Sequence, residues 1–180
     1  MLDPPPDEIL VVDSCLLIRL KKIVKVDEQW SLFAAMLDLV RGGSLCFPRQ
    51  VATEVADQRW PDAPGAWIGH AKEFVCHREP GDGCVSQVLA TASELIDADA
   101  TGTEPADPYV VAMALELQSV YANSRIAVAS DDKVDRLPLK LSLKTACDRL
   151  GIEFCEPPPF VEWVRDRSNG ASPTTSPVDE

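Results

Sequence analysis

Short apolar runs that alternate with segments of helical periodicity constrain the fold of this chain more than any other feature. Residues 9–13 and 125–129 are almost entirely apolar, which is typical of strands that are buried on both faces. Residues 44–47 and 152–155 are two further, shorter strand candidates. Because helical segments separate these runs, we expect a central parallel sheet of about four strands with helices on both faces, a three-layer α/β/α sandwich with right-handed crossovers.

Start and stop signals divide the intervals into helices. Ser14 and Asp107 are the expected caps of two helices, and Pro108 suits a first helical position. In residues 28–41 the side chains that recur at helical spacing include Trp30. The helix that Ser14 caps is expected over residues 14–22. Further helices are expected over residues 83–97, 142–150 and 160–167, together with one that opens at Pro48 and carries Glu54 and one that ends near His77.

The length of 180 residues and the 46% hydrophobic content suit one well-buried core. We expect an N-terminal tail over residues 1–8, a single domain over residues 9–167, and a disordered tail over residues 168–180, which is rich in Ser, Thr and Pro. Residues 60–97, between Glu54 and Asp107, form a helical insertion that we expect to add a lobe or a clip to the core.

Two features of the sequence indicate the cellular compartment of the protein: its targeting signals and its cysteines. No run approaches the roughly 20 apolar residues of a membrane span, and the acidic, proline-rich start does not resemble a signal peptide. We therefore expect a cytoplasmic protein without membrane contact. The six cysteines are interpreted as mostly buried free thiols. A zinc site made from His70, Cys76, His77 and Cys84 would match no common ligand spacing.

The formal charge of −12 argues against a protein that coats nucleic acid non-specifically, because phosphate binding depends on Lys and Arg. It does not exclude a nuclease, since a local basic rim can steer RNA to an acidic protein. The basic residues that flank the expected site are Lys21, Lys22, Arg49, Arg59 and Lys133.

Four carboxylates occupy positions that suggest chemistry. Asp13 closes the first strand, Glu54 lies on the helix after the second, Asp107 opens a later helix, and Asp132 follows the third strand. Parallel sheets bind ligands beyond the carboxyl ends of their strands. Each close pair of carboxylates costs roughly 4 kcal/mol at an effective dielectric near 20, so such a group requires a cation or raised pKa values. Oxygen-only ligands favour Mg²⁺ or Mn²⁺.

These motifs together resemble the PIN-domain ribonucleases. The resemblance rests on Asp13-Ser14 after a strand, Glu54, the segment 107–114 (Asp-Pro-Tyr-Val-Val-Ala-Met-Ala) and the segment 128–132 (Val-Ala-Ser-Asp-Asp). It covers roughly residues 8–156. Within that superfamily, the Asp-Pro-Tyr helix and the segment 144–152 resemble the PIN-like group DUF4411, whose nearest characterised relatives are toxins of the VapC type.

The resemblance implies an endoribonuclease that uses Mg²⁺ or Mn²⁺ to hydrolyse phosphodiester bonds in RNA, as the toxin of a toxin–antitoxin pair. Asp13, Glu54, Asp107 and Asp132 would hold the metal, and Ser14 would take the family's polar position after the first Asp. Ser130 matches the usual Ser or Thr two residues before the last acid, which favours Asp132 over Asp131. The implied partners are RNA and a cognate antitoxin protein. A homodimer with a second copy of the chain is compatible with the resemblance.

Other interpretations of the same residues stay open. Asp107 and Ser14 can be plain helix caps, and Glu54 a solvated helix residue. Trp60 and Trp67 can stack on RNA bases, receive an antitoxin segment or anchor the core. The protein as a whole can be a catalytically silent module that binds RNA or protein. A phosphatase with Asp13 as nucleophile would want a second Asp where Cys15 stands.

Overall fold

The computed structural model describes residues 5–56, 62–75, 77–97, 99, 102 and 104–170. Three residues with a role proposed from the sequence lie outside the described residues: Arg59, Trp60 and Cys76. Most of the expected N-terminal tail and residues 171–180 of the expected C-terminal tail also lie outside them.

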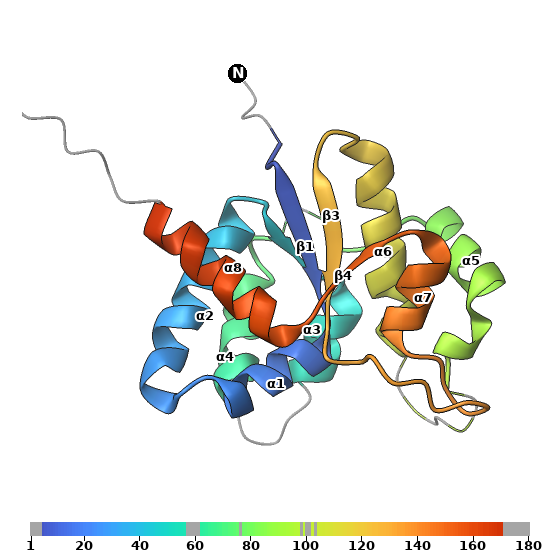
Figure 1. Cartoon of the computed structure of the whole chain (residues 1–180), viewed down its shortest axis with the longest axis horizontal. Coiled ribbons are helices and arrows are strands. Elements are labelled where there is room, and N and C mark those ends of the chain that lie inside the picture. Colours follow the sequence, from blue (N-terminus) through green and yellow to red (C-terminus); the bar gives the residue numbers. More distant parts are fainter. Residues whose placement is uncertain are drawn as a thin grey trace, which may run out of the picture.

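Four parallel strands form one sheet in the order β2-β1-β3-β4 (Figure 1). The strands are β1 (Glu8–Val12), β2 (Leu45–Cys46), β3 (Arg125–Ala129) and β4 (Glu153–Cys155). The central pair, β1 and β3, is aligned from Glu8 opposite Arg125 to Val12 opposite Ala129. The parallel sheet expected from the apolar runs is therefore confirmed, and its two longest strands lie side by side.

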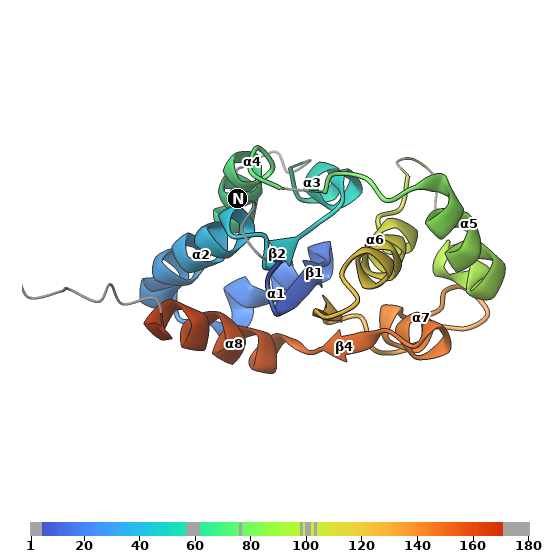
Figure 2. The same cartoon turned by 90° about the horizontal axis from the view of Figure 1, so that it is seen from above.

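Helices cover both faces of this sheet. They are α1 (Ser14–Ile23), α2 (Val26–Arg41), α3 (Arg49–Ala56), α4 (Ala63–Ala71), α5 (Asp82–Thr91), the 3₁₀ turn η1 (Ser93–Leu95), α6 (Asp107–Val120), α7 (Leu143–Leu150) and α8 (Pro157–Gly170). Seen from above, α2, α4 and α8 lie on one side of the sheet, and α6 and α7 lie on the other, with α5 outside α6 (Figure 2). The predicted three-layer α/β/α class is confirmed.

The core follows the apolar pattern of the strands. Residues 9–12 of β1 are at most 2% exposed, which is expected for a strand covered by helices on both faces. In α2 the buried side chains are Leu32, Phe33, Met36 and Val40, whereas Trp30 is 84% exposed. Trp30 shares the helical spacing but lies outside the stripe that α2 turns to the core.

The starts of two helices differ from the prediction by one residue. Asp13, not Ser14, is the N-cap of α1, and its carboxylate accepts a hydrogen bond from the Cys15 amide. Ala106, not Asp107, is the N-cap of α6, and the Asp107 side chain makes no capping hydrogen bond. Asp107 is the first helical residue, where a negative charge is stabilised by the positive end of the helix dipole. Ser14 and Asp107 are thus free to direct their side chains elsewhere.

Helix α8 begins three residues before the predicted start at Phe160. Its first turn consists of Pro157, Pro158 and Pro159, and the Phe160 amide is the first to donate back, to the Glu156 carbonyl at 3.1 Å. Proline fits these positions because the first amides of a helix need no partner within it. The helix continues to Gly170, so residues 168–170 do not belong to a disordered tail.

The insertion does not form one added lobe. Helix α4 packs on α2 and α3, and α5 packs on α6 at the far side of the molecule (Figure 2). Trp67 of α4 is 7% exposed and lies between Phe33 and Phe47, with ring centroids 6.0 and 5.7 Å away. Trp67 therefore anchors the core. Both helices end earlier than predicted, and α5 ends at Thr91 because the backbone of Ala92 leaves the helical region.

No helix among the described residues is long and apolar enough to cross a membrane.

A glycine exchange tests the turn that leads from α7 into β4. Gly151 has φ of 69° and ψ of 30°, a left-handed conformation that disfavours a side chain. We expect Gly151→Ala to lower the free energy of unfolding by about 1 kcal/mol. Around Gly69, in α4, no atom beyond its neighbours and the nearby backbone of its own helix lies within 4 Å of the place that a Cβ would take, so Gly69→Ala should raise the free energy of unfolding by about 0.5–1 kcal/mol. Urea unfolding midpoints measure both, and equal shifts would contradict the assignment.

Candidate functional site

The candidate site lies where the strand order reverses. From β1 the chain passes to β2 on one side, and later to β3 on the other, so the carboxyl ends of β1 and β3 flank a topological switch point. Open α/β sheets bind ligands in this position. Asp13 directly follows β1, and Ser130 directly follows β3.

Asp13 is completely buried and is held by donors from both strands' ends. Its carboxylate accepts hydrogen bonds from Ser130 Oγ at 2.8 Å and the Cys15 amide at 3.2 Å, and Ser14 Oγ lies 3.3 Å from it. Burial raises the pKa of Asp13 and outweighs the opposite effect of the Ser130 hydrogen bond, while the charge of Glu54 raises it further. The charged form of Asp13 is therefore disfavoured in this environment, and a neighbouring positive charge would stabilise it.

Glu54 joins three helices. Ser14 Oγ donates to Glu54 Oε2 at 2.5 Å, which links α3 to α1 and places Glu54 next to Asp13. The Ala106 amide donates to Glu54 Oε1 at 2.9 Å, so the same carboxylate receives the first amide at the start of α6. Glu54 is thus more than a solvated helix residue, and it forms one half of the site with Asp13.

The other half consists of Asp107, Asp132 and Lys140. The Lys140 ammonium lies 2.5 Å from Asp107 Oδ2 and 3.2 Å from Asp132 Oδ2. Asp107 is 7% exposed, and its Oδ2 atom accepts no well-oriented hydrogen bond from the described residues, so the ion pair is its compensation. Burial, with the charge of Asp13, raises the pKa of Asp107 to about 7, against the opposing effect of Lys140.

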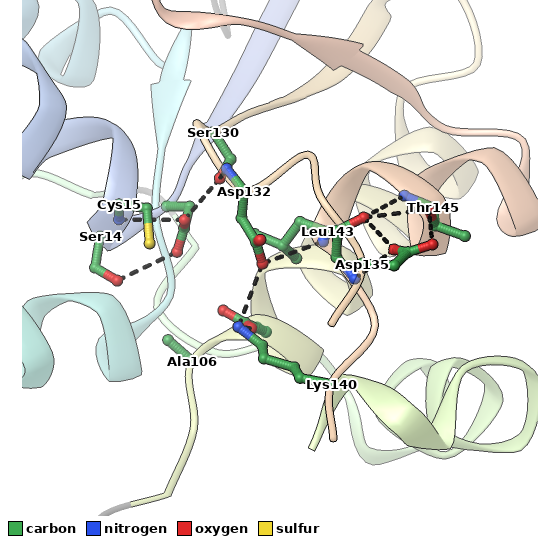
Figure 3. A network of polar contacts seen from close by, with 12 residues as sticks. Ser14, Cys15, Ala106, Ser130, Asp132, Asp135, Lys140, Leu143 and Thr145 are labelled. Atoms are coloured by element: carbon green, nitrogen blue, oxygen red, sulfur yellow. Dashed lines mark hydrogen bonds and ion pairs between the residues drawn. The ribbon is translucent and has the colours of Figure 1, made fainter. Parts of the chain in front are cut away.

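The turn after β3 separates the two adjacent aspartates. Ser130 Oγ accepts the Asp132 amide at 3.0 Å, and Asp132 Oδ2 accepts the Leu143 amide at 3.3 Å. Figure 3 shows Asp132 directed towards Lys140 and Leu143, across from Ser14 and Cys15. Asp131 instead faces Arg19, whose Nε is 3.5 Å from Asp131 Oδ2. The geometry brings Asp132 to the site and directs Asp131 to the outside.

Other residues considered from the sequence lie apart from these acids. His70 contacts Phe74, and His77 contacts Tyr121, each through a ring edge. Among the basic residues suggested for phosphate binding, three form ion pairs: Lys21 with Asp62, Arg49 with Glu79, and Lys133 with Glu156.

Sequence reasoning missed Lys140. It lies in a loop whose polar and apolar residues follow neither helix nor strand periodicity, so only the folded chain reveals its contact with Asp107 and Asp132.

Cys15 lies beside the acids and departs most from the expectation that the cysteines are buried, while Cys84 and Cys155 are half-buried. Cys46 and Cys147 are buried, whereas Cys15 is exposed. Desolvation and the negative charges of Asp13, Asp107 and Asp132 raise the pKa of the Cys15 thiol well above its usual range. A thiol in this state is a poor nucleophile, so the site offers carboxylate rather than thiolate chemistry.

The four acids form two neighbouring pairs. Ser14 connects Asp13 with Glu54, and Lys140 connects Asp107 with Asp132. Within the described ranges, no three His, Cys, Asp or Glu side chains are arranged as a ready-made metal site. The donor set nevertheless fits a hard divalent cation, because its ligands are oxygens and the ammonium group of Lys140 already lies between Asp107 and Asp132.

The fold and site define an α/β protein with an acidic centre at the switch point of its sheet. The chain belongs to the family described as "Domain of unknown function (DUF4411)", whose sequence profile matches residues 10–165. No curated protein matches the chain.

Stability should depend on pH through the buried carboxyl groups. The pKa of Asp107 in the folded protein, about 7, exceeds its ordinary value of 3.8, so the folded state binds the proton more tightly than the unfolded state. The resulting stabilisation is complete below pH 3.8 and is lost progressively as the pH rises from there through about 7. It amounts to at most roughly 4 kcal/mol. In metal-free buffer, Asp107→Asn should flatten the dependence of the melting temperature on pH between 4 and 8.

Asp148→Asn is the matched control, because Asp148 is an exposed carboxylate that pairs with Lys144 on α7. It should keep the pH profile of the wild type. If Asp107→Asn kept that profile as well, Asp107 would not be the group that titrates.

Proposed function

We propose that this protein is a PIN-like, Mg²⁺- or Mn²⁺-dependent endoribonuclease that hydrolyses phosphodiester bonds in RNA. The observation that carries the proposal is the meeting of Asp13, Glu54, Asp107 and Asp132, from four separate parts of the chain, at the switch point of a parallel sheet. The order of these acids along the chain and the elements that carry them are those of the PIN-like ribonucleases that the sequence resembles.

Each side chain has a role in this proposal. Asp13, Glu54, Asp107 and Asp132 hold the cation. A bound divalent cation supplies an activated water and neutralises charge on the phosphodiester. Ser130 and Ser14 fix the orientation of the carboxylates, because Ser130 Oγ donates to Asp13, and Ser14 Oγ donates to Glu54 while lying 3.3 Å from Asp13 Oδ1. The Leu143 amide orients Asp132 from the start of α7.

We further propose RNA as substrate and a cognate antitoxin as protein partner. Exposed apolar side chains support a protein partner: Val26 and Trp30, one turn apart on α2, are 85% and 84% exposed. Exposed tryptophan is frequent among the residues that dominate protein interfaces. This patch lies on α2, apart from the residues of the acidic site, so the partner would bind there without occupying the site.

A catalytically silent PIN-like module is the second candidate, and one observation favours it. Each of the four acids has a partner within the protein, in Ser14, Ser130, the Ala106 amide or Lys140. The fold can therefore accommodate the acids without a cation. Activity measurements separate the two candidates.

The cleavage assay uses purified full-length protein and a mixed single-stranded and structured RNA. We expect cleavage with Mg²⁺ or Mn²⁺ that stops in excess chelator and falls at least a hundredfold in Asp13→Asn, since a ligand is lost at the centre of the site. Asp148→Asn should cleave like the wild type. Full activity in chelator would refute the metal mechanism, and inactivity of the wild type with both metals would favour the silent module.

The two aspartates after β3 provide a sharper comparison. Asp132→Ala should weaken cation binding and cleavage strongly, because Asp132 shares Lys140 with Asp107 at the site. Asp131→Ala should change the rate by less than about tenfold, or 1.4 kcal/mol, because Asp131 faces Arg19. Parallel cleavage rates and Mn²⁺ titrations measure both. The reverse ranking would make Asp131 the ligand.

A further inference from the structure

Lys140 occupies the position of a cation inside the acidic site. Its side chain is 16% exposed, and its ammonium group contacts Asp107 Oδ2 and Asp132 Oδ2. Both carboxylates are themselves nearly enclosed, with exposed fractions of 10% and 12%. An ammonium group that is so little hydrated is held by these charges: burial alone would lower its pKa, but Asp107 and Asp132 raise it.

The backbone brings Lys140 to this point without tying it into a helix or strand of the core. Residues 136–140 form a small hairpin, in which the Arg136 amide donates to the Lys140 carbonyl at 2.8 Å and the Lys140 amide donates to the Arg136 carbonyl at 3.2 Å. Leu137 and Leu139 in this segment are exposed, so few core contacts fix it. Such a segment can shift at low cost compared with β1, β3 or α6.

A divalent cation and the ammonium cannot both occupy this space. Mg²⁺ requires carboxylate oxygens at about 2.0–2.1 Å and near-octahedral geometry. The Lys140 ammonium lies within contact of the same Oδ2 atoms that a cation between Asp107 and Asp132 would use. Binding of the cation at these oxygens therefore requires that Lys140 leave them.

We propose that Lys140 competes with the divalent cation for Asp107 and Asp132, and that it sets the metal affinity of the site as a built-in counter-cation. This inference rests on the proposed metal-dependent function. In the metal-free protein Lys140 relieves the repulsion between the two carboxylates. In the metal-bound protein the ammonium is released towards solvent, together with a shift of the 136–140 hairpin.

Metal titration by calorimetry, with Mn²⁺ as the probe, tests the competition. Lys140→Met should bind Mn²⁺ at least tenfold more tightly than the wild type. Its metal-free melting temperature should fall, because two buried carboxylates lose their partner, and saturating Mn²⁺ should raise it more than in the wild type. Lys140→Arg, which keeps the charge, should bind Mn²⁺ nearly as the wild type does.

Lys144→Met is the matched control, since Lys144 is an exposed lysine that pairs with Asp148 outside the site. Its Mn²⁺ affinity should equal that of the wild type. If Lys140→Met bound Mn²⁺ equally or more weakly, competition would be refuted, whereas cation binding and RNA cleavage by the wild type would leave the proposed function intact. If neither the wild type nor Lys140→Met bound Mn²⁺, both proposals would fail.

A measurement on the unmodified chain covers the case in which Lys140→Met does not fold. Acetylation of the wild type, followed by mass spectrometry of its peptides, compares Lys140 with Lys144 with and without Mn²⁺. We expect Lys140 to be protected without metal and to react at least several-fold faster at saturating Mn²⁺, while Lys144 does not change. Equal protection of Lys140 in both conditions would overturn the proposal.

Discussion

A carboxyl group without solvent exposure is the constraint on which the structure around the site depends. Asp13 closes β1 inside the protein, and a buried acid is tolerated only when neighbouring groups compensate for its lost hydration. The compensation comes from Ser130, at the end of β3, and from the first turn of α1. A shift of one residue between β1 and β3 would remove the Ser130 hydroxyl from Asp13, so the alignment of the central strands and the polar centre stabilise each other.

The side-chain groups that compensate the acids are of two kinds, hydroxyl groups and one ammonium group. Ser14 and Ser130 serve Asp13 and Glu54, whereas Lys140 serves Asp107 and Asp132. The hydroxyl groups can keep their bonds when a cation arrives, because each donates a single proton to an oxygen that has further lone pairs. The ammonium group carries a full charge in the space that a cation needs. The two halves of the site therefore differ in how much they must reorganise, although all four acids are carboxylates.

Much of the fold could be predicted from local patterns, because apolar runs and helix breakers act over a few residues. The strand at residues 125–129 and the end of α7 at Gly151 match the expectation. The parts that failed depend on the folded chain. Asp107 looks like a cap by its position before Pro108, yet tertiary contact with Lys140 decides its role. Similarly, the acids could be selected by their order on the predicted elements, but the counter-charge that reaches them from a loop has no local signature.

The separation of the acidic residues along the chain has a consequence for synthesis. The first half of the site, Asp13 with Glu54, belongs to the amino-terminal part of the protein, whereas β3 and the residues after it complete the centre. A ribosome releases the chain from its amino terminus, and β1 reaches its central neighbour only when β3 has emerged. The nascent polypeptide consequently lacks an assembled centre until β3 and the residues that follow it have emerged, so any activity of this centre would be withheld from the ribosome and from the message up to that point.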